Sequence, residues 1–388
     1  MFPGVIPAMP PTYAILRSCF SRSWGGLEIT ALETTALLRD RGHRVRLACV
    51  PESRLARAAA ERDLATIPLA VTGYAHPMLA ARLARELRAR PVDLIHSEHS
   101  RDLATLVGAI RISARAIPLL LTKQMGSYIM KRDLLHRITF AHVDRVLAIS
   151  DVLRKNVLET TPMPPEKVTV LHHAVDTELF SPARVDRWRV RREFGIPDEA
   201  ILVGFVGRFS PGKGQEELLA ALQTLAPRHP RLRCLIVGEA SFGEKEYEQQ
   251  VRERAARLGL DGLVTFAGFR SDIPEVMATF DIFAFPSHAE AFGIVLIEAM
   301  AMERPVVSTD CDGVLDIVEN GVTGVYVRPR EAASLARGLE TLIADPPLRA
   351  RMGTAGRERV LRMFDQQKRM ERLEAIYGEV LRERAAAV

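Results

Sequence analysis

Short apolar runs alternate with amphipathic stretches along nearly all of the 388-residue chain. The runs are almost continuous and rich in Val, Ile and Leu, as expected of strands buried on both faces of a parallel sheet. We expect such strands at 13–19, 44–50, 92–96, 119–122, 145–149, 201–206, 233–237, 264–266, 282–285, 306–309 and 324–327. Between them, residues 29–39, 218–225 and 245–258 show the periodicity of helices. The alternation predicts an α/β protein with parallel sheets covered by helices on both faces.

The pattern is interrupted once, near 182–197, where the charged stretch 184–193 separates two sets of strands. A chain of this length suits two domains of ordinary size. We therefore place an N-terminal domain at 1–182 and a second domain at 183–365. Residues 366–388 form a charged helical segment with no strand after it, which we expect to pack back toward the N-terminal domain.

The cysteines, the apolar stretches and the N-terminal residues indicate which cellular compartment to expect. The four cysteines are scattered without paired spacing, which argues against a disulfide framework or a zinc site and for a reducing compartment. No apolar stretch approaches the roughly 20 residues that span a bilayer, and residues 1–11 do not have the pattern of a signal peptide. We expect a cytoplasmic protein, peripheral to the inner face of the membrane at most. The net charge of +5 fits an anionic ligand or membrane face, and equally an ordinary solvated surface.

A glycine pair, Gly25-Gly26, follows the first expected strand and precedes a helix. Glycines at such a turn let the backbone approach a ligand closely, and a helix N-terminus favours an anion. The turn is not G-x-G-x-x-G, so the nicotinamide fingerprint is missing. The pair is explained either by ligand approach or by a tight turn.

A second glycine-rich turn runs from Gly207 to Gly214, after the strand at 201–206. It imitates a P-loop, but Gly214 stands where a Ser or Thr would hold magnesium, and Pro211 lacks a backbone N–H. Arg208 and Lys213 can instead clamp a diphosphate without a metal. The alternative is a surface turn with incidental charges.

The most informative segment is 286–300, where a loop carrying Glu290 leads into an apolar helix bearing Glu298. A carboxylate on a mostly apolar helix needs a partner, and a ribose diol would supply two hydroxyl donors. The alternative partner is a nearby arginine. Backbone N–H groups at the start of the helix can bind sugar or phosphate oxygens, namely those of Phe292, Gly293 and Ile294.

The E-x7-E spacing from Glu290 to Glu298, preceded by Pro-Ser and followed by Ala-Met-Ala, resembles the signature of glycosyltransferase family 4 (glycosyl transferases group 1). These are retaining enzymes of the GT-B fold. The resemblance covers nearly the whole chain. The other matching segments, in order, are Gly25-Gly26 with Arg41-Gly42-His43, residues 143–150, Gly207-Arg208, Lys213-Gly214 and residues 268–272. The resemblance implies two Rossmann-like domains facing across a cleft, with 1–182 on the acceptor side and 183–365 binding a nucleotide sugar.

The implied reaction moves a sugar from a nucleotide-diphosphate sugar to an acceptor hydroxyl with retained anomeric configuration. Arg208, Lys213 and the helix start would stabilise the diphosphate, while Glu290 would hold the sugar hydroxyls and Glu298 the ribose. The expected donor-binding residues are Gly25, Gly26, Arg208, Lys213, Arg270, Phe292, Gly293, Ile294 and Glu298. A UDP-sugar is expected first, with GDP- and ADP-sugars as alternatives. We expect no cofactor and no metal, since the D-x-D triplet at 310–312 arises easily by chance.

The first domain offers two candidates for a residue that faces the donor sugar. Members of the family often carry His-x-His after the fourth strand, whereas this chain has His96-Ser97-Glu98-His99. The counterpart is Glu98 by strict spacing, or His99 with a shift of one residue. We favour His99, and name Glu290 and His99 as the catalytic pair.

The resemblance to bacterial envelope transferases suggests a glycan or lipid-linked acceptor, such as one of lipopolysaccharide biosynthesis, and no nucleic acid. The segment 131–137 mixes cations with apolar residues, so it either touches an anionic lipid or forms a plain solvated helix. Four positions depart from the family pattern: Glu303 replaces a common glycine, Asp316 replaces a Glu, and His173-Ala174 replaces a frequent Asn-Gly. The alternative functions are a nucleotide-sugar epimerase or hydrolase of the same fold, a non-catalytic nucleotide-sugar binding protein and, less favoured, a P-loop nucleotidase.

Overall fold

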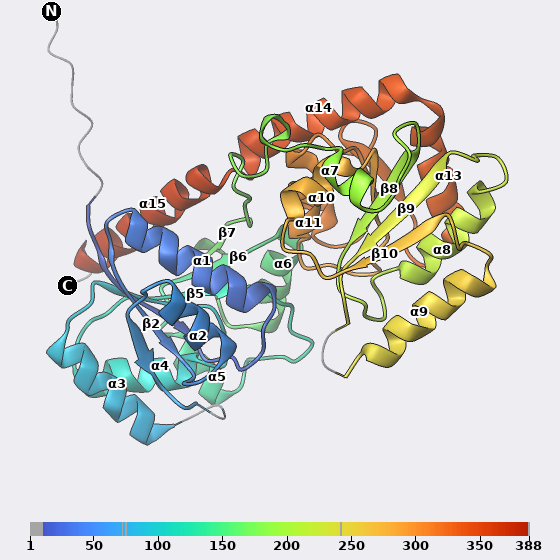
Figure 1. Ribbon diagram of the computed structural model, residues 1–388. Helices are drawn as coiled ribbons and strands as arrows, with labels where there is room; N and C mark the ends of the chain where they lie inside the picture. The colour runs from blue at the N-terminus through green and yellow to red at the C-terminus, as the bar shows by residue number, and fades with distance from the viewer. Residues whose placement is uncertain (1–10, 72, 74–75, 241–242, 387–388) are drawn as a thin grey trace, which may run out of the picture. The chain divides into compact units, whose positions relative to one another are not determined.

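The computed structural model describes residues 11–71, 73, 76–240 and 243–386 (Figure 1). The interpretation of the N-terminal segment therefore falls almost wholly outside the described residues. The chain divides into two compact units, Met1–Leu171 with Met370–Val388, and His172–Arg369. The sequence had suggested a boundary at 182/183. Residues 172–182 instead belong to the second unit, where Val175 forms a bridge to Asp365 and the Thr177 hydroxyl donates to the Asp365 carboxylate at 2.6 Å.

The first unit contains a sheet of parallel strands in the order β3-β2-β1-β4-β5-β6-β7. The strands are β1 (Ala14–Cys19), β2 (Arg44–Cys49), β3 (Thr66–Pro68), β4 (Leu94–Ser97), β5 (Leu119–Lys123), β6 (Arg145–Ala148) and β7 (Val168–Val170). The helices are α1 (Gly26–Asp40), α2 (Arg54–Glu61), α3 (Pro77–Ala89), α4 (Leu103–Ser113), α5 (Leu134–Phe140), α6 (Asp151–Thr160) and most of α15 (Gln366–Ala386), with a 3-10 turn at Pro165–Lys167. The short edge strands β3 and β7 were not predicted.

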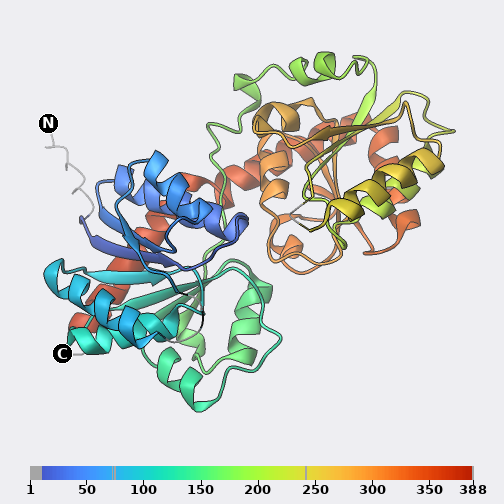
Figure 2. The same ribbon diagram turned by 60° about the horizontal axis from the view of Figure 1, so that its bottom comes forward.

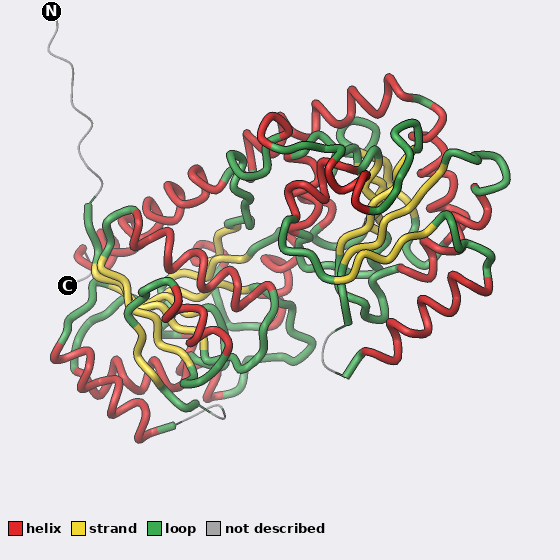
Figure 3. The backbone as a smooth tube through the Cα atoms, in the orientation of Figure 1, coloured by secondary structure: helices red, strands yellow, loops and turns green. Residues whose placement is uncertain are grey.

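The second unit repeats this plan with parallel strands in the order β10-β9-β8-β11-β12-β13. The strands are β8 (Ile201–Val206), β9 (Leu232–Val237), β10 (Val264–Gly268), β11 (Ile282–Phe285), β12 (Val306–Thr309) and β13 (Gly324–Val327). The helices are α7 (Arg189–Glu193), α8 (Gln215–Leu225), α9 (Lys245–Arg257), α10 (Ile273–Thr279), α11 (Ile294–Ala301), α12 (Val314–Ile317), α13 (Ala332–Ala344) and α14 (Pro346–Met363), with a 3-10 turn at Pro182–Arg184. Within each unit, helices flank the sheet (Figure 3).

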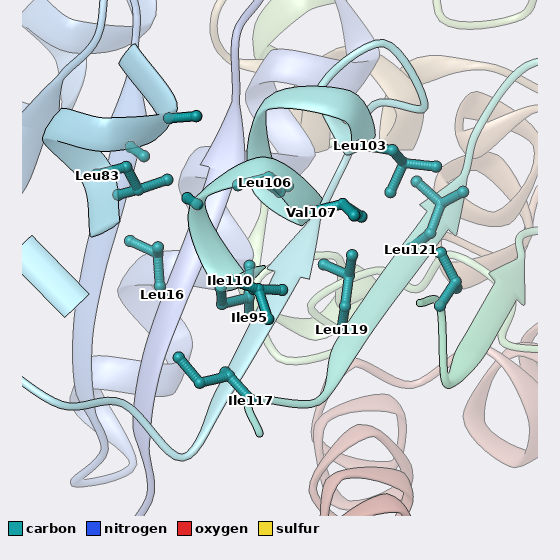
Figure 4. Packing of buried hydrophobic residues seen from close by; sticks show 14 of the residues in the cluster. Leu16, Leu83, Ile95, Leu103, Leu106, Val107, Ile110, Ile117, Leu119 and Leu121 are labelled. Carbon is teal, nitrogen blue, oxygen red and sulfur yellow. The ribbon is translucent and has the colours of Figure 1, made fainter. Parts of the chain in front are cut away.

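Both faces of the first sheet are covered, as the continuous apolar runs predicted. Successive side chains of a strand point to opposite faces. Leu16 lies in the cluster that β1, β4 and β5 form with α3 and α4 (Figure 4), whereas its neighbour Ile15 lies in a cluster with α15. Helices α3 and α4 pack against each other, as Figure 1 and Figure 2 show from two directions.

Helix starts follow local sequence signals. The side chains of Ser53, Asp133 and Ser150 accept hydrogen bonds from the first turns of α2, α5 and α6, which satisfies N–H groups that a helix leaves without partners. Each of these residues directly precedes its helix, so it fixes the position at which the helix begins.

Helix α15 begins in the second unit, and its residues from Met370 onward belong to the first. Met370, Leu373, Tyr377 and Val380 share one face at helical spacing and are buried against the sheet. Ion pairs hold the flanks: Arg41 contacts Glu374 at 2.6 and 2.8 Å, and Arg145 contacts Glu383 at 2.7 Å. The helix therefore completes the hydrophobic core of the first unit.

Candidate active site

In the second unit, the candidate ligand-binding loops lie at the point where the strand order reverses. Strands β8 and β11 are hydrogen-bonded neighbours, although the chain makes β9 and β10 between them. Connections diverge from the carboxyl ends of such a pair, which leaves a crevice where ligands bind in open α/β sheets. The two segments singled out from the sequence, 207–214 and 286–293, directly follow these two strands.

The loop 207–214 is shaped by glycine. Gly212 and Gly214 have φ of +88° and +81°, a region that L residues rarely adopt. A Cβ placed on Gly214 would lie 2.2 Å from the carbonyl oxygen of Pro286. A Ser or Thr therefore does not fit at 214, which is the physical reason why this loop departs from the magnesium-binding P-loop.

Lys213 and Glu290 meet across the two loops. The Lys213 Nζ lies 2.6 Å from the Glu290 Oε2, with 25% and 20% of the two side chains exposed. Arg208 is exposed on the same loop, and its backbone carbonyl accepts a hydrogen bond from the Gln215 side chain at 2.8 Å. The structure thus brings the proposed phosphate cation and the proposed sugar carboxylate into direct contact.

The start of helix α11 lies beside Glu290. Gly293, with φ of +104°, precedes the first helical residue, Ile294. The described residues provide no acceptor for the backbone N–H groups of Phe292, Gly293 and Ile294. The Phe292 side chain is buried against His172, His173 and Phe364, so this residue can offer a ligand only its backbone. Such N–H groups form an anion-binding site.

Glu298 lies on the second turn of α11 and is half-buried. The flanking residues Ile297 and Ala299 are fully buried, which fits the expectation that a carboxylate here has a specific partner.

Residues that the sequence analysis did not assign hold the two loops together. The His288 backbone N–H donates to the Gly212 carbonyl at 2.8 Å, and the His288 ring pairs with Glu217 at 2.8 Å. The backbone N–H of Glu290 donates to Asp312 at 3.3 Å. These contacts fix the loop that carries Glu290. The sequence motif contains His288 directly after Pro-Ser, but the sequence did not indicate that its partner is Glu217 on α8.

Arg270 lies in a cluster of carboxylates. Its guanidinium forms ion pairs with Glu193 and, at 2.7 Å, with Asp272. These contacts raise the pKa of Arg270, the larger share coming from Glu193, and keep the side chain charged. A phosphate would have to replace one of these carboxylates to reach Arg270.

The first unit has the same topological feature between β1 and β4, which are neighbours in its sheet. Gly25 precedes α1 and Gly26 is its first residue. A Cβ on Gly26 would meet nothing within 4 Å, and one on Gly25 would make only an ordinary contact with Glu28 at 3.7 Å. Internal packing therefore does not require either glycine, in keeping with the close ligand approach considered from the sequence.

Glu98 and His99 differ sharply in their environment. Glu98 is 2% exposed and forms a buried ion pair with Arg17, and its second oxygen accepts from Gln124 at 2.7 Å. The side chain of His99 is 22% exposed. Burial, with Arg101, Lys123 and Lys131 nearby, lowers the pKa of His99 to about 4, so its ring is neutral at pH 7. Of the two candidates, only His99 can reach a ligand without breaking a buried ion pair.

The described part of the chain contains no group of three or more His, Cys, Asp or Glu side chains placed to hold a metal ion. Among the same residues, no helix has both the length and the apolar character that crossing a bilayer requires. Cys19, Cys49, Cys234 and Cys311 are buried free thiols.

Both units contain a parallel sheet whose first six strands follow the relative order 3-2-1-4-5-6, and the first sheet carries a seventh strand at its edge. Two such sheets are the arrangement of the GT-B class of α/β protein. The crystal structure of HepE from Anabaena in complex with UDP has this fold: it superposes with a TM-score of 0.83 over 94% of this chain and 99% of that chain, at 25% identity. Residues 24–179 match the family model described as Glycosyltransferase Family 4, and residues 186–359 match Glycosyl transferases group 1. The chain belongs to glycosyltransferase family 4.

Two relatives illustrate the range of the family. A D-inositol 3-phosphate glycosyltransferase of Stackebrandtia nassauensis is 33% identical over 257 residues, 63% of this chain and 57% of that protein. The capsular polysaccharide biosynthesis glycosyltransferase CapM of Staphylococcus aureus is 29% identical over 256 residues, 64% of this chain and 65% of that protein. The aligned part spans less than two thirds of either relative.

Proposed function

We propose that the chain is a retaining glycosyltransferase that moves a sugar from a nucleotide-diphosphate sugar to an acceptor hydroxyl. The observation that carries the proposal is the contact between Lys213 and Glu290, beside the N–H groups of Phe292, Gly293 and Ile294 at the start of α11. A cation, a carboxylate and N–H groups converge where a phosphate and a sugar would be held together.

The roles follow from the charges. Lys213, Arg208 and the α11 N–H groups would stabilise the negative charge that grows on the leaving diphosphate. Glu290 would accept hydrogen bonds from sugar hydroxyls and Glu298 from the ribose. In a retaining reaction of this kind, the leaving phosphate takes the proton of the acceptor hydroxyl, so we assign no protein nucleophile. Neutral His99 would hydrogen-bond to the donor sugar.

For the donor, we propose a UDP-sugar. The fold neighbour HepE was crystallised with UDP, and a metal-independent diphosphate site agrees with the cations of the loop 207–214. For the acceptor, we propose a cell-envelope glycan or a lipid-linked saccharide such as a lipopolysaccharide precursor, on the cytoplasmic side of the membrane. The acceptor proposal is supported by the relative CapM, which is named as a capsular polysaccharide biosynthesis glycosyltransferase.

The experiment that tests the donor site is thermal stabilisation by a panel of nucleotides and sugar nucleotides in EDTA, for wild type and Lys213→Ala. A selective rise with one nucleotide diphosphate, lost in the variant, supports the metal-free clamp and identifies the base. A rise that needs magnesium would favour a P-loop nucleotidase. Turnover of the sugar nucleotide that is unaffected by any acceptor would favour a hydrolase or epimerase.

A peripheral membrane contact is supported by one surface segment. Large apolar side chains are exposed along residues 125–138, at Met125, Tyr128, Ile129, Met130, Leu134, Leu135 and Ile138. Cations of the same segment, Arg132 and Arg137, are exposed among them. Exposed apolar residues flanked by cations fit the interface of an anionic bilayer.

Sedimentation with vesicles tests this contact. The double variant Ile129→Ser, Leu134→Ser should lose binding to vesicles that contain phosphatidylglycerol, whereas Ile112→Ser, at an exposed position on α4, should retain it. Equal binding by all three proteins would remove the membrane from the proposal.

A further inference from the structure

A cavity of about 240 Å³ lies in the first unit, lined by residues at the end of α5 and by residues just before β7. Phe140, Val143 and Met163 form part of its wall and are almost fully buried. All three belong to the hydrophobic core of the unit. An apolar cavity of about 150 Å³ is known to hold a benzene molecule. The cavity beside α5 can therefore take a ring or a short stretch of alkyl chain.

Two cations line the same cavity, Arg137 from α5 and Lys167 from the 3-10 turn before β7. The Arg137 Nε donates to the Arg132 carbonyl at 3.0 Å. Within the described part of the chain, no carboxylate forms an ion pair with Arg137 or Lys167. A guanidinium carries five N–H donors and an ammonium three, so both side chains can bind an anion. An apolar wall with cationic donors suits a molecule that has an apolar chain and one anionic group.

The cavity lies at the edge of the sheet opposite to the candidate active site. Strands β6 and β7 run parallel to the rest of their sheet. Val143 comes just before β6, and Lys167 directly precedes β7, so the cavity is at the amino ends of these strands. His99 follows β4 at the carboxyl edge, where open α/β sheets bind their substrates. A molecule in the cavity is therefore distinct from the acceptor that His99 would meet.

The surface beside the cavity indicates the source of such a molecule. Helix α5 carries Arg137, which lines the cavity, and also Leu134, Leu135 and Ile138, whose side chains are exposed. These three belong to the surface segment for which we proposed a membrane contact. A lipid of an anionic bilayer that touches this segment would have its phosphate near the cations of the cavity and its acyl chain near the apolar wall.

We propose that the cavity binds one anionic glycerophospholipid, with its phosphate on Arg137 and Lys167 and part of an acyl chain against Phe140, Val143 and Met163. This inference rests on the membrane contact proposed above and goes beyond it. Adsorption to a charged surface requires no defined site, whereas the cavity holds a single lipid molecule with a negatively charged headgroup. The lipid is bound and is not consumed, so it fixes how the first unit lies on the membrane.

The test uses a short-chain lipid that stays in solution, so that binding to the cavity is separated from adsorption to a bilayer. The full chain is titrated calorimetrically with dihexanoyl phosphatidylglycerol below its critical micelle concentration, and with dihexanoyl phosphatidylcholine as the zwitterionic comparison. We expect saturable binding of one phosphatidylglycerol per chain. Phosphatidylcholine should bind at least about tenfold more weakly, because its headgroup has no net negative charge.

Two variants remove the cations one at a time. Arg137→Met and Lys167→Met delete the charge and keep most of the apolar stem. Lys155→Met is the matched control, because Lys155 is an exposed lysine on α6 of the same unit. We expect each cavity variant to raise the Kd for the soluble phosphatidylglycerol by about tenfold or more, while the control binds as wild type does. Urea unfolding shows whether each variant is folded.

A second arm separates the cavity from the membrane contact. The double variant Ile129→Ser, Leu134→Ser should lose binding to vesicles that contain phosphatidylglycerol and still bind the soluble lipid as wild type does. Wild type that binds the soluble lipid but no vesicles would remove the membrane contact and retain the lipid site. The proposal is overturned if wild type shows no saturable binding of the soluble lipid, if it binds both headgroups equally, or if both cavity variants bind as Lys155→Met does.

Discussion

Removing one charge at a time from Lys213 and Glu290 should affect UDP binding in opposite ways. Without a ligand, the two groups pair at 2.6 Å, but both are partly exposed, so the pair itself contributes no more than about 1 kcal/mol. A diphosphate would replace Glu290 as the partner of Lys213. A hydrogen bond to a charged group is worth about 1.5–3 kcal/mol net, which corresponds to roughly 10- to 150-fold in Kd.

We therefore expect Lys213→Met to raise the Kd for UDP by roughly 10- to 150-fold. Glu290→Gln should change that Kd by less than about fivefold, toward tighter binding, because the carboxylate no longer competes for Lys213. The same Glu290→Gln change should lower turnover of the sugar nucleotide by at least about tenfold, because it weakens the grip on the sugar.

Isothermal titration with UDP in EDTA measures both single variants and the double variant. The double variant should bind UDP as Lys213→Met does, since the competition that Glu290→Gln relieves no longer exists. The reasoning is refuted if Glu290→Gln weakens UDP binding as strongly as Lys213→Met, or if Lys213→Met leaves the Kd within about twofold of wild type.

Three further predictions concern stability. Gly214→Ser, with φ of +81° and a Cβ 2.2 Å from the Pro286 carbonyl oxygen, should lower the free energy of unfolding by at least about 2 kcal/mol; magnesium-dependent nucleotide binding by this variant would contradict the account of the loop. Glu98→Ala should cost about 3–5 kcal/mol in urea unfolding, because it leaves Arg17 charged and buried; a loss below about 1 kcal/mol would count against the buried pair. Burial lowers the pKa of His173 to about 3, from about 6.5 in the unfolded chain. Since the unfolded state alone takes up the proton, wild type should lose about 2 kcal/mol more than His173→Asn between pH 7 and pH 5, and equal losses in urea unfolding would refute the shift.

The sequence predicted the parts of the fold that repeat a strong local pattern. Eleven apolar runs correspond to strands of the two sheets, whereas β3 and β7 were missed because each has only three residues at a sheet edge. The strand orders themselves depend on pairings such as β8 with β11, which join residues far apart in the chain.

For the site, residue types and spacing identified the two loops but not the environment of each side chain. Strict spacing pointed to Glu98, and His99 needed a shift of one residue. The sequence could not show that Glu98 is buried in an ion pair, because its partner Arg17 lies 81 residues away. The structure accounts for the glycine that the family usually has at position 303, since the φ of +59° at Glu303 is a conformation that glycine adopts without strain.

The hydrophobic face of α15 has a consequence for synthesis. The first unit needs Met370, Leu373, Tyr377 and Val380 for its core, and the ribosome makes these residues only after the whole of the second unit. Until these residues are made, the sheet of the first unit lacks part of its core, and side chains such as Ile15 and Leu94 remain exposed to solvent. By then the second unit is already complete and can fold. Release of α15 residues from the ribosome would then be the event that lets the first-made unit reach its native state, so a pause or truncation before residue 370 should expose it to chaperones and proteases.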